Sequence, residues 1–321
     1  MALRIASLSP YPEEVVRGLL ADVADLEVVL VPPPPAPDAV RAAVADADLV
    51  LGDKKHRHRL DRDALAGMRR CRLVQQPAVG FDSIDHRAAA ELGIPVANAI
   101  GYNRDAVADW TVLAILALVR DAARADRAMH RGEWPYATMR GRELGALTVG
   151  IVGLGHVGDA VATRLRAFGS RVLFTDVVTR SLPGAASLPL ADLLAEADVV
   201  TVHVPLDHDT RHLIGDAELA RMRPGAVLIN ASRGPVVDEA ALVRALESGH
   251  LGGAGLDVFE AEPLAADSPL RALDNVFLSP HAGALTEEAE ARLLEMCGAN
   301  LRRVAGGLEP FNVVNGVTRR R

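Results

Sequence analysis

Aromatic residues and cysteines are scarce in this sequence. Aromatics make up 3% of the 321 residues although 50% of the chain is hydrophobic, so any core must be aliphatic and built mainly from Ala, Leu and Val. The two cysteines, Cys71 and Cys297, lie far apart and outside any paired motif. Their placement argues against a disulfide framework and against a zinc site, and it fits a reducing compartment.

Long hydrophobic runs and an excess of basic residues are also missing. The longest apolar run, Trp110–Val119, is too short to span a bilayer, and the first residues are typical of a strand and not of a signal peptide. The formal net charge of -7 argues against a general nucleic-acid binder, which needs an extended basic surface. We therefore expect a soluble, cytoplasmic protein that has neither a membrane nor a nucleic acid as a partner.

Short apolar runs alternate with helical patterns over roughly the first hundred residues. Strand patterns stand at Leu3–Leu8, Glu27–Val31, Asp48–Leu51, Arg72–Gln75 and Pro95–Ala97, and helical periodicity fills gaps such as Pro12–Val23, Pro37–Ala45 and Ile84–Leu92. This alternation predicts a parallel sheet with helices on both faces. Pro32–Pro35 predicts a stiff surface loop.

A second series of strands follows a long helical stretch, Asn103–Arg131. Its strands are expected at Leu147–Val152, Arg171–Thr175, Asp198–Val202, Ala226–Asn230, Gly253–Asp257 and Val276–Ser279, with helices such as Val157–Phe168 and Asp238–Glu247 between them. The last helix, Thr286–Val304, and the tail are too small for a domain, so we expect them to pack on the first series. We predict an α/β protein whose cofactor domain, residues 101–285, is inserted into a substrate domain, residues 1–100 and 286–321, with a hinged cleft between them.

The sequence Gly153-Leu-Gly155-His-Val-Gly158 stands directly between a strand pattern and a helix pattern. In a dinucleotide-binding loop the first glycine permits a tight turn, the second lets the backbone approach the pyrophosphate, and the third lets helix and strand pack closely. The N-terminus of the following helix offers N–H groups and a positive dipole to the phosphates. Glycine-rich turns are common, so the flanking strand and helix are what make this one informative.

An acidic residue at the end of the next strand supports a dinucleotide site. Asp176 follows the last glycine at close to the spacing of about 20 residues expected for a carboxylate that binds the adenine ribose hydroxyls. A carboxylate there repels a 2′-phosphate, which favours NAD over NADP, although the nearby Arg180 weakens that preference a little. The alternative is an ordinary tight turn with an exposed Asp at a strand end.

Three reactive side chains stand just past the ends of later strands. Arg233, Glu262 and His281 each follow one of the last three strands of the second series. Because ligands of open parallel sheets bind at the carboxyl ends of the strands, we expect all three on one edge. Taken singly, each has an ordinary structural interpretation: Arg233 as part of a helix-capping ion pair, Glu262 as a surface residue of a loop, and His281 as a structural histidine. Together, beside a dinucleotide loop, they favour catalysis.

Hydride transfer to a 2-keto acid needs such a set of groups. A planar guanidinium suits the substrate carboxylate, and a histidine suits protonation of the carbonyl oxygen. A carboxylate hydrogen-bonded to that histidine favours its charged form and fixes the ring. The sequence therefore predicts an oxidoreductase that transfers a hydride between NAD(H) and a small 2-hydroxy or 2-keto acid. We expect no metal site.

These residues lie in motifs that resemble those of the D-isomer-specific 2-hydroxyacid dehydrogenases, along nearly the whole chain. The motifs are the phosphate loop, Asn-Ala-Ser-Arg-Gly at 230–234, Asp-Val-Phe-Glu-Ala-Glu-Pro at 257–263, Ser-Pro-His at 279–281, Val-Gly-Phe-Asp-Ser-Ile-Asp at 79–85 and Asn-Arg-Asp-Ala-Val-Ala-Asp at 103–109. The resemblance implies a Rossmann cofactor domain inserted in a flavodoxin-like substrate domain. It also implies a homodimer formed through the cofactor domain, and a short form similar to glyoxylate/hydroxypyruvate reductases, without a regulatory domain.

The resemblance implies roles for single residues. It implies Arg233 as the cation that orients the substrate, His281 as the acid/base and Glu262 as its partner. Backbone N–H groups at Val79 and Gly80 are implied to help hold the substrate carboxylate. The cofactor-binding residues that it implies are Gly153, Gly155, His156, Val157 and Gly158 at the pyrophosphate, Asp176 at the ribose, Val204 and Pro205 beside the adenine, and Ala231, Ser232, Arg233, Asp257, His281, Gly283 and Ala284 towards the nicotinamide.

The chain departs from the family at several positions. Asp109 stands where the family often has Glu, and Arg104 where it often has Ser. Members that oxidise phosphoglycerate carry Arg where this chain has Gln76, and often another where it has Gly52. The resemblance therefore argues against a phosphoglycerate substrate.

Two features keep more than one interpretation. The basic run Lys54–Arg59 is either a solvated surface or, through Lys54 or Arg57, a site for a second anionic group of the substrate. Trp134 is a core residue, a dimer contact or a wall of the partner subunit's site. For the whole protein, the alternative from another class is a non-catalytic NAD-sensing scaffold or corepressor-like protein of the same fold. The alternative among enzymes is a formate or phosphonate-linked dehydrogenase.

Overall fold

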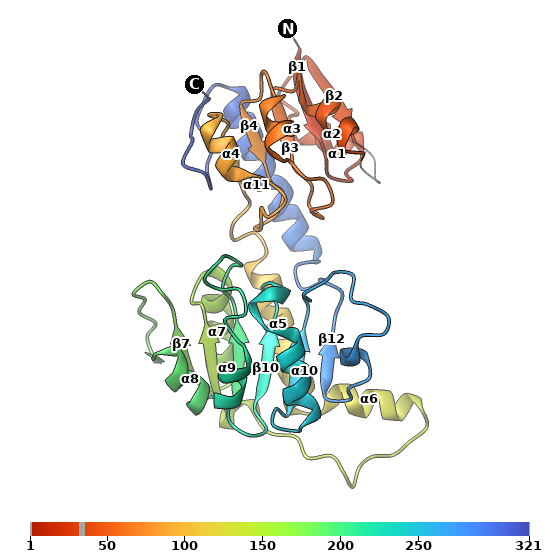
Figure 1. Ribbon diagram of the computed structural model, residues 1–321, viewed down its shortest axis with the longest axis vertical. Helices are drawn as coiled ribbons and strands as arrows, with labels where there is room; N and C mark the ends of the chain where they lie inside the picture. The colour runs from red at the N-terminus through yellow and green to blue at the C-terminus, as the bar shows by residue number, and fades with distance from the viewer. Residues whose placement is uncertain (1, 32–35, 321) are drawn as a thin grey trace. The chain divides into compact units, whose positions relative to one another are not determined.

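The computed structural model describes residues 2–31 and 36–320, which form two units (Figure 1). Unit 1 consists of Met1–Asn103 and Thr286–Arg321, and unit 2 of Arg104–Leu285. The loop expected at Pro32–Pro35 lies outside the described residues. Within the described part of the chain, no helix is both long enough and apolar enough to cross a membrane.

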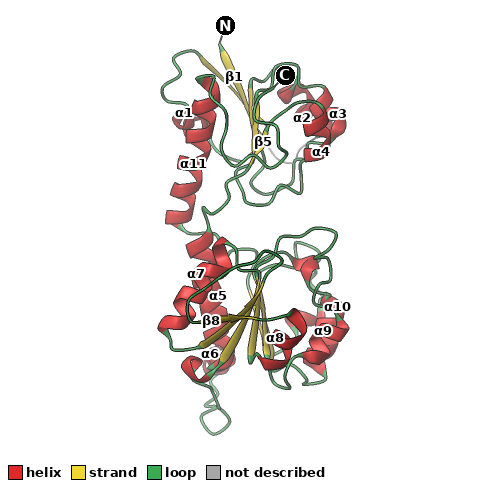
Figure 2. Cartoon of the chain, turned by 90° about the vertical axis from the view of Figure 1, so that its left-hand side faces the viewer, coloured by secondary structure: helices red, strands yellow, loops and turns green. Residues whose placement is uncertain are grey.

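Unit 1 is built on a five-stranded parallel sheet. Its strands are β1 (Leu3–Ser7), β2 (Leu26–Leu30), β3 (Leu49–Leu51), β4 (Leu73–Gln75) and β5 (Val96–Ala97), in the order β2-β1-β3-β4-β5. As Figure 2 shows, one face is covered by α1 (Glu13–Leu19) and α11 (Glu287–Ala305), and the other by α2 (Pro37–Val44), α3 (Arg62–Ala66) and α4 (His86–Glu91). This order is flavodoxin-like, and ligands of such sheets bind at the switch point between β1 and β3.

The C-terminal part of the chain completes unit 1. Asn300 on α11 is 3% exposed, donates to Gln75 Oε1 (2.7 Å) and accepts from Phe311 N (2.7 Å). Farther along the tail, Asn315 Oδ1 accepts from Val96 N (3.1 Å) at β5. Buried polar groups need hydrogen-bond partners, so these amides fix α11 and the tail on the sheet.

Unit 2 is built on a seven-stranded parallel sheet. Its strands are β6 (Thr148–Val152), β7 (Arg171–Thr175), β8 (Ala185–Ser187), β9 (Val199–Val202), β10 (Val227–Asn230), β11 (Gly253–Leu256) and β12 (Val276–Leu278), in the order β12-β11-β10-β9-β6-β7-β8. One face is covered by α5 (Arg104–Val119) and α7 (His156–Ala167), and the other by α8 (Leu190–Glu196), α9 (Asp216–Arg221) and α10 (Glu239–Glu247) (Figure 2). The strand order reverses between β6 and β9, and ligands bind at such a switch point.

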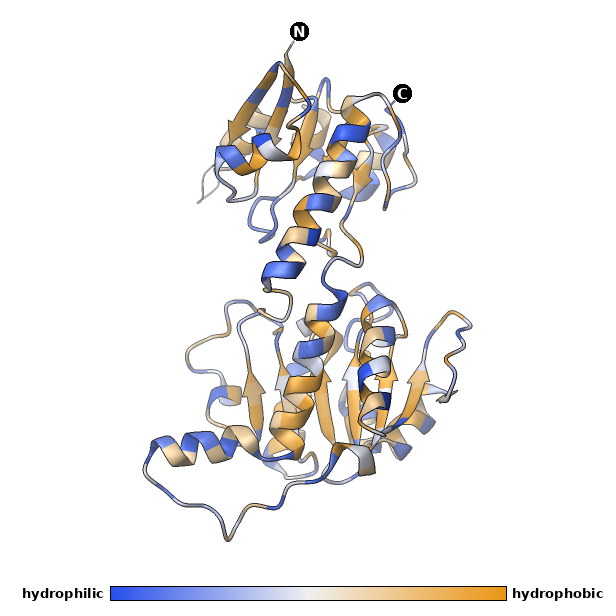
Figure 3. Cartoon of the chain, turned by 180° about the vertical axis from the view of Figure 1, so that it is seen from behind, coloured by the Kyte–Doolittle hydropathy of each residue, from blue (hydrophilic) through white to orange (hydrophobic). Residues whose placement is uncertain are grey.

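The core of each unit is aliphatic, as the composition predicts. Figure 3 colours the strands of unit 2 mostly orange, and Ile5, Leu49, Ile151 and Leu228 are 0% exposed. Burying one such side chain contributes roughly 1.5–3 kcal/mol. Strands that are apolar on both faces need helices on both faces. The predicted fold class, parallel sheets flanked by helices, is therefore confirmed.

One helix prediction is wrong. The stretch Asn103–Arg131 contains two helices, α5, which ends at Val119, and α6 (Ala122–His130). They are separated by Asp121, whose φ of 57° is left-handed and cannot continue an α-helix. Asp adopts this conformation more readily than most residues, and its carboxylate accepts from Arg124 Nε (2.9 Å). The pattern of apolar residues also did not predict β8 (Ala185–Ser187). This is a short edge strand, and its sequence Ala-Ala-Ser has little β-propensity.

Candidate active site

The glycine loop joins β6 to α7, and backbone geometry requires its first and third glycines. Gly153 has a φ of +94°, a left-handed conformation that favours glycine. A Cβ at Gly158 would lie 2.2 Å from the carbonyl oxygen of Gly153, so only glycine allows α7 to pack this closely. The loop therefore turns sharply and places the start of α7 at the carboxyl edge of the sheet.

The second glycine has no such packing role. A Cβ at Gly155 would meet no described atom within 4 Å. Gly155 is the N-cap of α7 and makes no side-chain capping bond, so the first N–H groups of the helix, at His156 and Val157, lack that partner. A helix N-terminus of this kind attracts anions. The open space and the helix start together fit a pyrophosphate group.

Asp176 lies beside the glycine loop at the end of β7. Its carboxylate accepts hydrogen bonds from Leu154 N (2.8 Å) and Val178 N (2.9 Å). Each carboxylate oxygen has a second lone pair, so the fixed carboxylate can still accept bonds from a ribose diol. Val204 lies close to the same loop. If Gly153 carried a Cβ, that atom would be only 2.9 Å from Val204 Cγ1. Pro205, the next residue, follows it in the loop after β9.

Arg233 lies in the loop after β10, and Asn230 shapes that loop. Asn230 is 1% exposed, its Nδ2 donates to Arg233 O (2.9 Å), and its Oδ1 accepts from Ser232 N (3.0 Å). The guanidinium of Arg233, which is half-buried, donates to Ser232 O (2.8 Å). One buried amide thus fixes the course of the chain through Ala231 to Arg233.

Glu262 and His281 are in direct contact. His281 Nδ1 lies 2.8 Å from Glu262 Oε2, and the other carboxylate oxygen accepts from Phe259 N (3.2 Å). Because the carboxylate accepts, Nδ1 carries the proton, and Nε2 is the nitrogen that remains for a substrate. The His281 and Glu262 side chains are 46% and 36% exposed, so a ligand can reach the pair.

The charges around Glu262 keep it ionised. Burial opposes this, but the hydrogen bond and charge of His281, the Phe259 N–H group and the charge of Arg233 together lower the pKa of the Glu262 carboxyl below its ordinary value. Arg233 is therefore near enough to act on the same carboxylate. The structure brings together the three side chains that follow β10, β11 and β12.

Asp257 organises the turn that carries His281. Asp257 is 2% exposed, and its carboxylate accepts hydrogen bonds from Ala282 N (2.7 Å), Gly283 N (2.8 Å) and the hydroxyl of Ser279. His281 has a left-handed φ of 54°, which costs about 1–3 kcal/mol in a non-glycine residue. The bonds to Asp257 offset this strain and hold residues 281–284 in place against Glu262.

Two loops of this site are joined by a contact that the sequence did not predict. His212 Nε2 lies 2.6 Å from Glu260 Oε1, and His212 N donates to Pro235 O (2.8 Å). Glu260 belongs to the loop of Glu262 and Pro235 to the loop of Arg233, so His212 connects the two. Apolar periodicity carries no signal for such a residue, because it lies in a loop and acts through polar contacts.

Val79 and Gly80 lie in unit 1, in the loop after β4. Asn98 Nδ2 donates to Val79 O (2.7 Å), which holds the peptide. Gln76, in the same loop, packs over Gly52, where a Cβ would lie 2.2 Å from Gln76 Oε1. The two positions at which the resemblance sets this chain apart from phosphoglycerate-oxidising members are therefore neighbours, and the end of the Gln76 side chain lies over Gly52.

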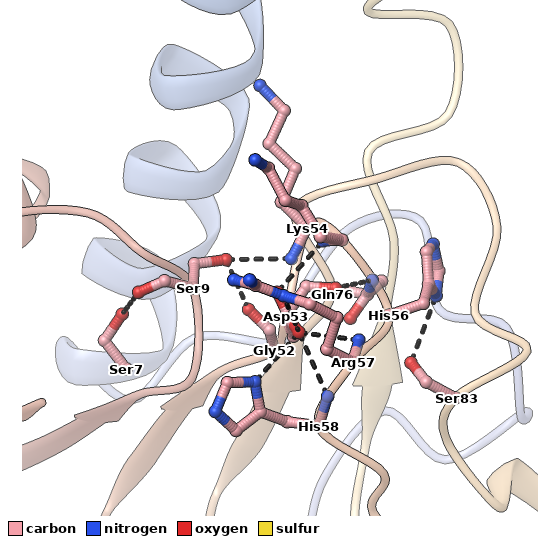
Figure 4. Close-up of polar contacts among 11 residues, drawn as sticks. Ser7, Ser9, Gly52, Asp53, Lys54, His56, Arg57, His58, Gln76 and Ser83 are labelled. Atoms are coloured by element: carbon pink, nitrogen blue, oxygen red, sulfur yellow. Dashed lines mark hydrogen bonds and ion pairs between the residues drawn. The ribbon is translucent and has the colours of Figure 1, made fainter. Parts of the chain in front are cut away.

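The basic run Lys54–Arg59 folds around Asp53 at the carboxyl end of β3 (Figure 4). The Asp53 carboxylate lies 2.8 Å from His58 Nδ1, and both side chains are 0% exposed. It also accepts from three backbone N–H groups, those of Lys55 (2.9 Å), Arg57 (2.7 Å) and His58 (3.0 Å). Burial opposes ionisation, but these bonds outweigh it and lower the pKa of Asp53. Lys54 forms an ion pair with Glu290 on α11, so the run is more than a solvated surface.

Trp134 follows α6 and is 78% exposed. This exposure excludes the core interpretation of the residue. Tyr136, two positions on, is 80% exposed, so this segment of unit 2 presents two aromatic side chains to its surroundings. Cys71 and Cys297 are both buried free thiols.

Comparison with known proteins gives a consistent result. Residues 112–283 match the family described as D-isomer specific 2-hydroxyacid dehydrogenase, NAD binding domain. The chain is 40% identical over 320 residues to a glyoxylate reductase of Aeropyrum pernix, with 95% of this chain and 93% of that protein covered. It is 39% identical over 290 residues to a glyoxylate reductase of Korarchaeum cryptofilum, with 88% and 87% covered. The crystal structure of D-lactate dehydrogenase from Aquifex aeolicus, complexed with NAD and lactic acid, has a TM-score of 0.83 at 32% identity and covers 97% of this chain and 99% of that chain.

Proposed function

We propose that this chain, which belongs to the D-isomer-specific 2-hydroxyacid dehydrogenases and is an NAD-dependent enzyme, reduces small 2-keto acids to D-2-hydroxy acids. Glyoxylate is proposed as a substrate because relatives at 40% and 39% identity are named glyoxylate reductases. Hydroxypyruvate is proposed from the resemblance to glyoxylate/hydroxypyruvate reductases. The observation that carries the proposal is the contact of His281 with Glu262, close to the charge of Arg233. A proton donor, its counter-charge and a cation for the substrate thus lie at one edge of unit 2.

Arg233 is proposed to bind the substrate carboxylate. A guanidinium can donate two parallel hydrogen bonds to a carboxylate, which fixes the orientation of the substrate as well as its position. Because Asn230 already fixes the loop, little ordering remains to be done when the substrate binds. The backbone N–H groups of Val79 and Gly80 are proposed as further donors to the same carboxylate.

His281 is proposed as the acid of reduction and the base of oxidation. NADH, when bound, supplies the hydride. Nε2 of the imidazolium donates its proton to the carbonyl oxygen, so that the carbonyl becomes a hydroxyl group and the imidazole is left neutral. Glu262 stabilises the imidazolium through Nδ1. In the reverse direction Nε2 accepts the hydroxyl proton.

The NAD-binding residues are proposed from the geometry of unit 2. The pyrophosphate is assigned to the glycine loop and the start of α7, where space and N–H groups are present. The adenine ribose is assigned to Asp176, whose fixed carboxylate favours NAD over NADP. Val204 and Pro205 are assigned to the adenine. The nicotinamide end is assigned to the loop of Arg233 and to the turn 281–284, which Asp257 holds.

A substrate panel tests the proposal. NADH consumption is measured with glyoxylate, hydroxypyruvate and pyruvate, then repeated with NADPH. The products of hydroxypyruvate and pyruvate, which are chiral whereas that of glyoxylate is not, are separated on a chiral column. We expect turnover of at least one of the first two acids, a preference for NADH, and the D isomer wherever the product is chiral. Tight NADH binding without turnover of any 2-keto acid would refute the proposal and favour the NAD-sensing scaffold. Turnover of formate or of a phosphonate-linked substrate alone would favour the other enzyme classes.

A homodimer through unit 2 is also proposed. α5 is largely apolar, yet its Leu113 is 54% exposed, and the aromatic segment at Trp134 is exposed as well. Apolar surface of this kind is typical of an interface. Light scattering is expected to give twice the chain mass and Leu113→Glu to lower it, whereas a monomeric wild type would refute the dimer. The cytoplasmic location stays a prediction.

A further inference from the structure

Two histidines of unit 2 with the same unusual backbone conformation contact one short segment. His212, in the loop after β9, and His281, in the loop after β12, have left-handed φ values of 53° and 54°. His212 Nε2 lies 2.6 Å from Glu260 Oε1, and His281 Nδ1 lies 2.8 Å from Glu262 Oε2. Residues other than glycine keep this conformation only where the surrounding structure enforces it, and they are frequent at functional sites. The segment 260–262 is thus held at both ends.

The backbone of His212 is fixed to the chain that follows Arg233. His212 N donates to Pro235 O (2.8 Å), and two residues farther on Ile214 N donates to Val236 O (3.1 Å). Ile214 and Val236 are both 0% exposed, so this pairing lies in the interior of unit 2. The His212 side chain therefore extends from a firm base beside the loop of Arg233.

The loop after β11, which carries Glu262, packs on the loop after β10 through its backbone. A Cβ at Gly234 would lie 1.9 Å from Phe259 O and 2.6 Å from Glu260 N, so the two backbones touch at this point. Glu239, at the start of α10, accepts from Glu260 N (3.1 Å). Residues 260–262 are exposed. Packing thus fixes the loop as far as Phe259, and polar contacts fix its course from there to Glu262.

Reduction of a 2-keto acid needs a set separation between two groups of this site. The carboxylate and the carbonyl group of such a substrate are on adjacent carbon atoms, so the cation and the acid that serve them must be held a matching distance apart. A misplacement of about 1 Å can slow a reaction by about 100-fold. Arg233 follows β10, whereas the acid, His281, is held by Glu262 after β11. A contact that joins these two loops therefore acts on the separation.

We propose that His212 is a positioning residue for this reaction. Its contact with Glu260 keeps the segment of Glu262 in place beside the loop of Arg233, so that the proton donor stays at the right distance from the substrate carboxylate. This inference rests on the proposed function, the reduction of small 2-keto acids with His281 as the acid. It assigns His212 no contact with substrate or NAD and no transfer of the proton.

His212→Asn and Glu260→Ala test the inference by removing the contact from either end. Asn adopts a left-handed backbone readily, but its side chain ends short of the position of Nε2. The His212 and Glu260 side chains are 43% and 38% exposed, and exposed pairs contribute little to stability, so we expect nearly unchanged melting temperatures. An ordinary surface pair would leave the kinetics unchanged as well, and this is where the two interpretations differ.

The assay is a single turnover of enzyme-bound NADH in a stopped-flow instrument, with the 2-keto acid that the wild type reduces fastest. The rate at saturating substrate reports the chemical step, and the substrate concentration at half of that rate reports binding. We expect the saturating rate to fall roughly 10-fold in each variant, while the half-saturating concentration and the NADH dissociation constant change less than about 2-fold. Because both variants break the same contact, the double variant should be no slower than either single one.

Two controls separate positioning from a general effect on the loops. Glu260→Gln keeps an oxygen that can accept from His212, so it should retain most of the wild-type rate. His208→Asn makes the same substitution in the loop of His212, at a fully exposed side chain whose Nδ1 lies 3.1 Å from Oδ1 of the neighbouring Asp209. We expect the wild-type rate in this variant.

An unchanged rate in folded His212→Asn or Glu260→Ala would overturn the inference. Losses that multiply in the double variant, a Glu260→Gln rate as low as that of Glu260→Ala, or an equal loss in His208→Asn would overturn it too. Circular dichroism and the melting temperature report folding, and failure of both single variants to fold would contradict a role confined to positioning.

The wild type distinguishes this inference from the proposed function. A wild type that turns over no 2-keto acid would overturn both. Turnover by the wild type together with wild-type rates in the variants overturns the inference about His212 alone.

Discussion

Replacing Glu262 with Gln removes the counter-charge of His281 while it keeps the size of the side chain. Nδ1 and Oε2 are 2.8 Å apart, and an amide oxygen can still accept this hydrogen bond. What is lost is the attraction between a carboxylate and the imidazolium, which is the form that donates a proton in reduction. The substitution therefore measures the electrostatic part of the contact.

The size of the effect follows from the geometry and the exposure of the pair. Two unit charges about 4 Å apart attract by about 4 kcal/mol at an effective dielectric constant of about 20. Solvent screens much of this, because the His281 and Glu262 side chains are 46% and 36% exposed. We expect about 1 kcal/mol to remain. In transition-state terms this is a loss of roughly 5-fold in kcat/KM.

The assay is NADH oxidation at saturating NADH with glyoxylate varied, over a range from mildly acidic to mildly alkaline pH. In the wild type the lowered pKa of Glu262 keeps its carboxylate ionised throughout this range, and its contribution is lost only as the pH falls through that lowered pKa. In the variant, kcat/KM with glyoxylate should be lower than in the wild type at neutral pH, where the wild-type Glu262 is ionised. Equal rates and equal pH profiles for the two proteins would refute the role of Glu262.

Three further predictions follow from other contacts. Arg233→Lys should raise KM for glyoxylate roughly 10–100-fold in steady-state assays, with a smaller change in the NADH dissociation constant, because an ammonium cannot make the planar two-point contact; an unchanged KM would contradict this. Asp53→Asn should lower the free energy of unfolding in urea by about 1–3 kcal/mol at neutral pH. The folded-state pKa of Asp53 is lowered, so this stabilisation is present above the ordinary pKa of Asp and disappears as the pH falls through the lowered value; a difference between the two proteins that is constant with pH would contradict it. Asp176→Ala should raise kcat/KM with NADPH relative to NADH about 10-fold by removing a negative charge from the ribose site, and the kinetics with the two cofactors measure this directly.

Much of the fold could be predicted from the sequence, because strands buried on both faces are continuous apolar runs. β7 occupies Arg171–Thr175, as the pattern indicates, and the other predicted strands differ by a residue or two at their ends. The family and the NAD cofactor predicted from the motifs are confirmed by the comparisons. The break between α5 and α6 could not be predicted, since it depends on one left-handed residue, Asp121.

For the candidate site, the sequence could name residues but not their contacts. Arg233, Glu262 and His281 could be named because each follows a strand end, where ligands of parallel sheets bind. Lys54 and Glu290 belong to separate elements 236 positions apart in the chain, and no local pattern connects them. Contacts of this kind are set by tertiary packing, so they become visible only in the folded chain.

Turnover by His281→Ala is the most direct test of the central claim, that His281 is the acid of a 2-keto acid reductase. NADH oxidation with glyoxylate gives kcat, and fluorescence titration gives the dissociation constant of NADH. We predict that kcat falls about 10²–10⁴-fold, the contribution expected of general acid catalysis, while NADH binding changes little. A His281→Ala enzyme that turns over glyoxylate as fast as the wild type would contradict the claim.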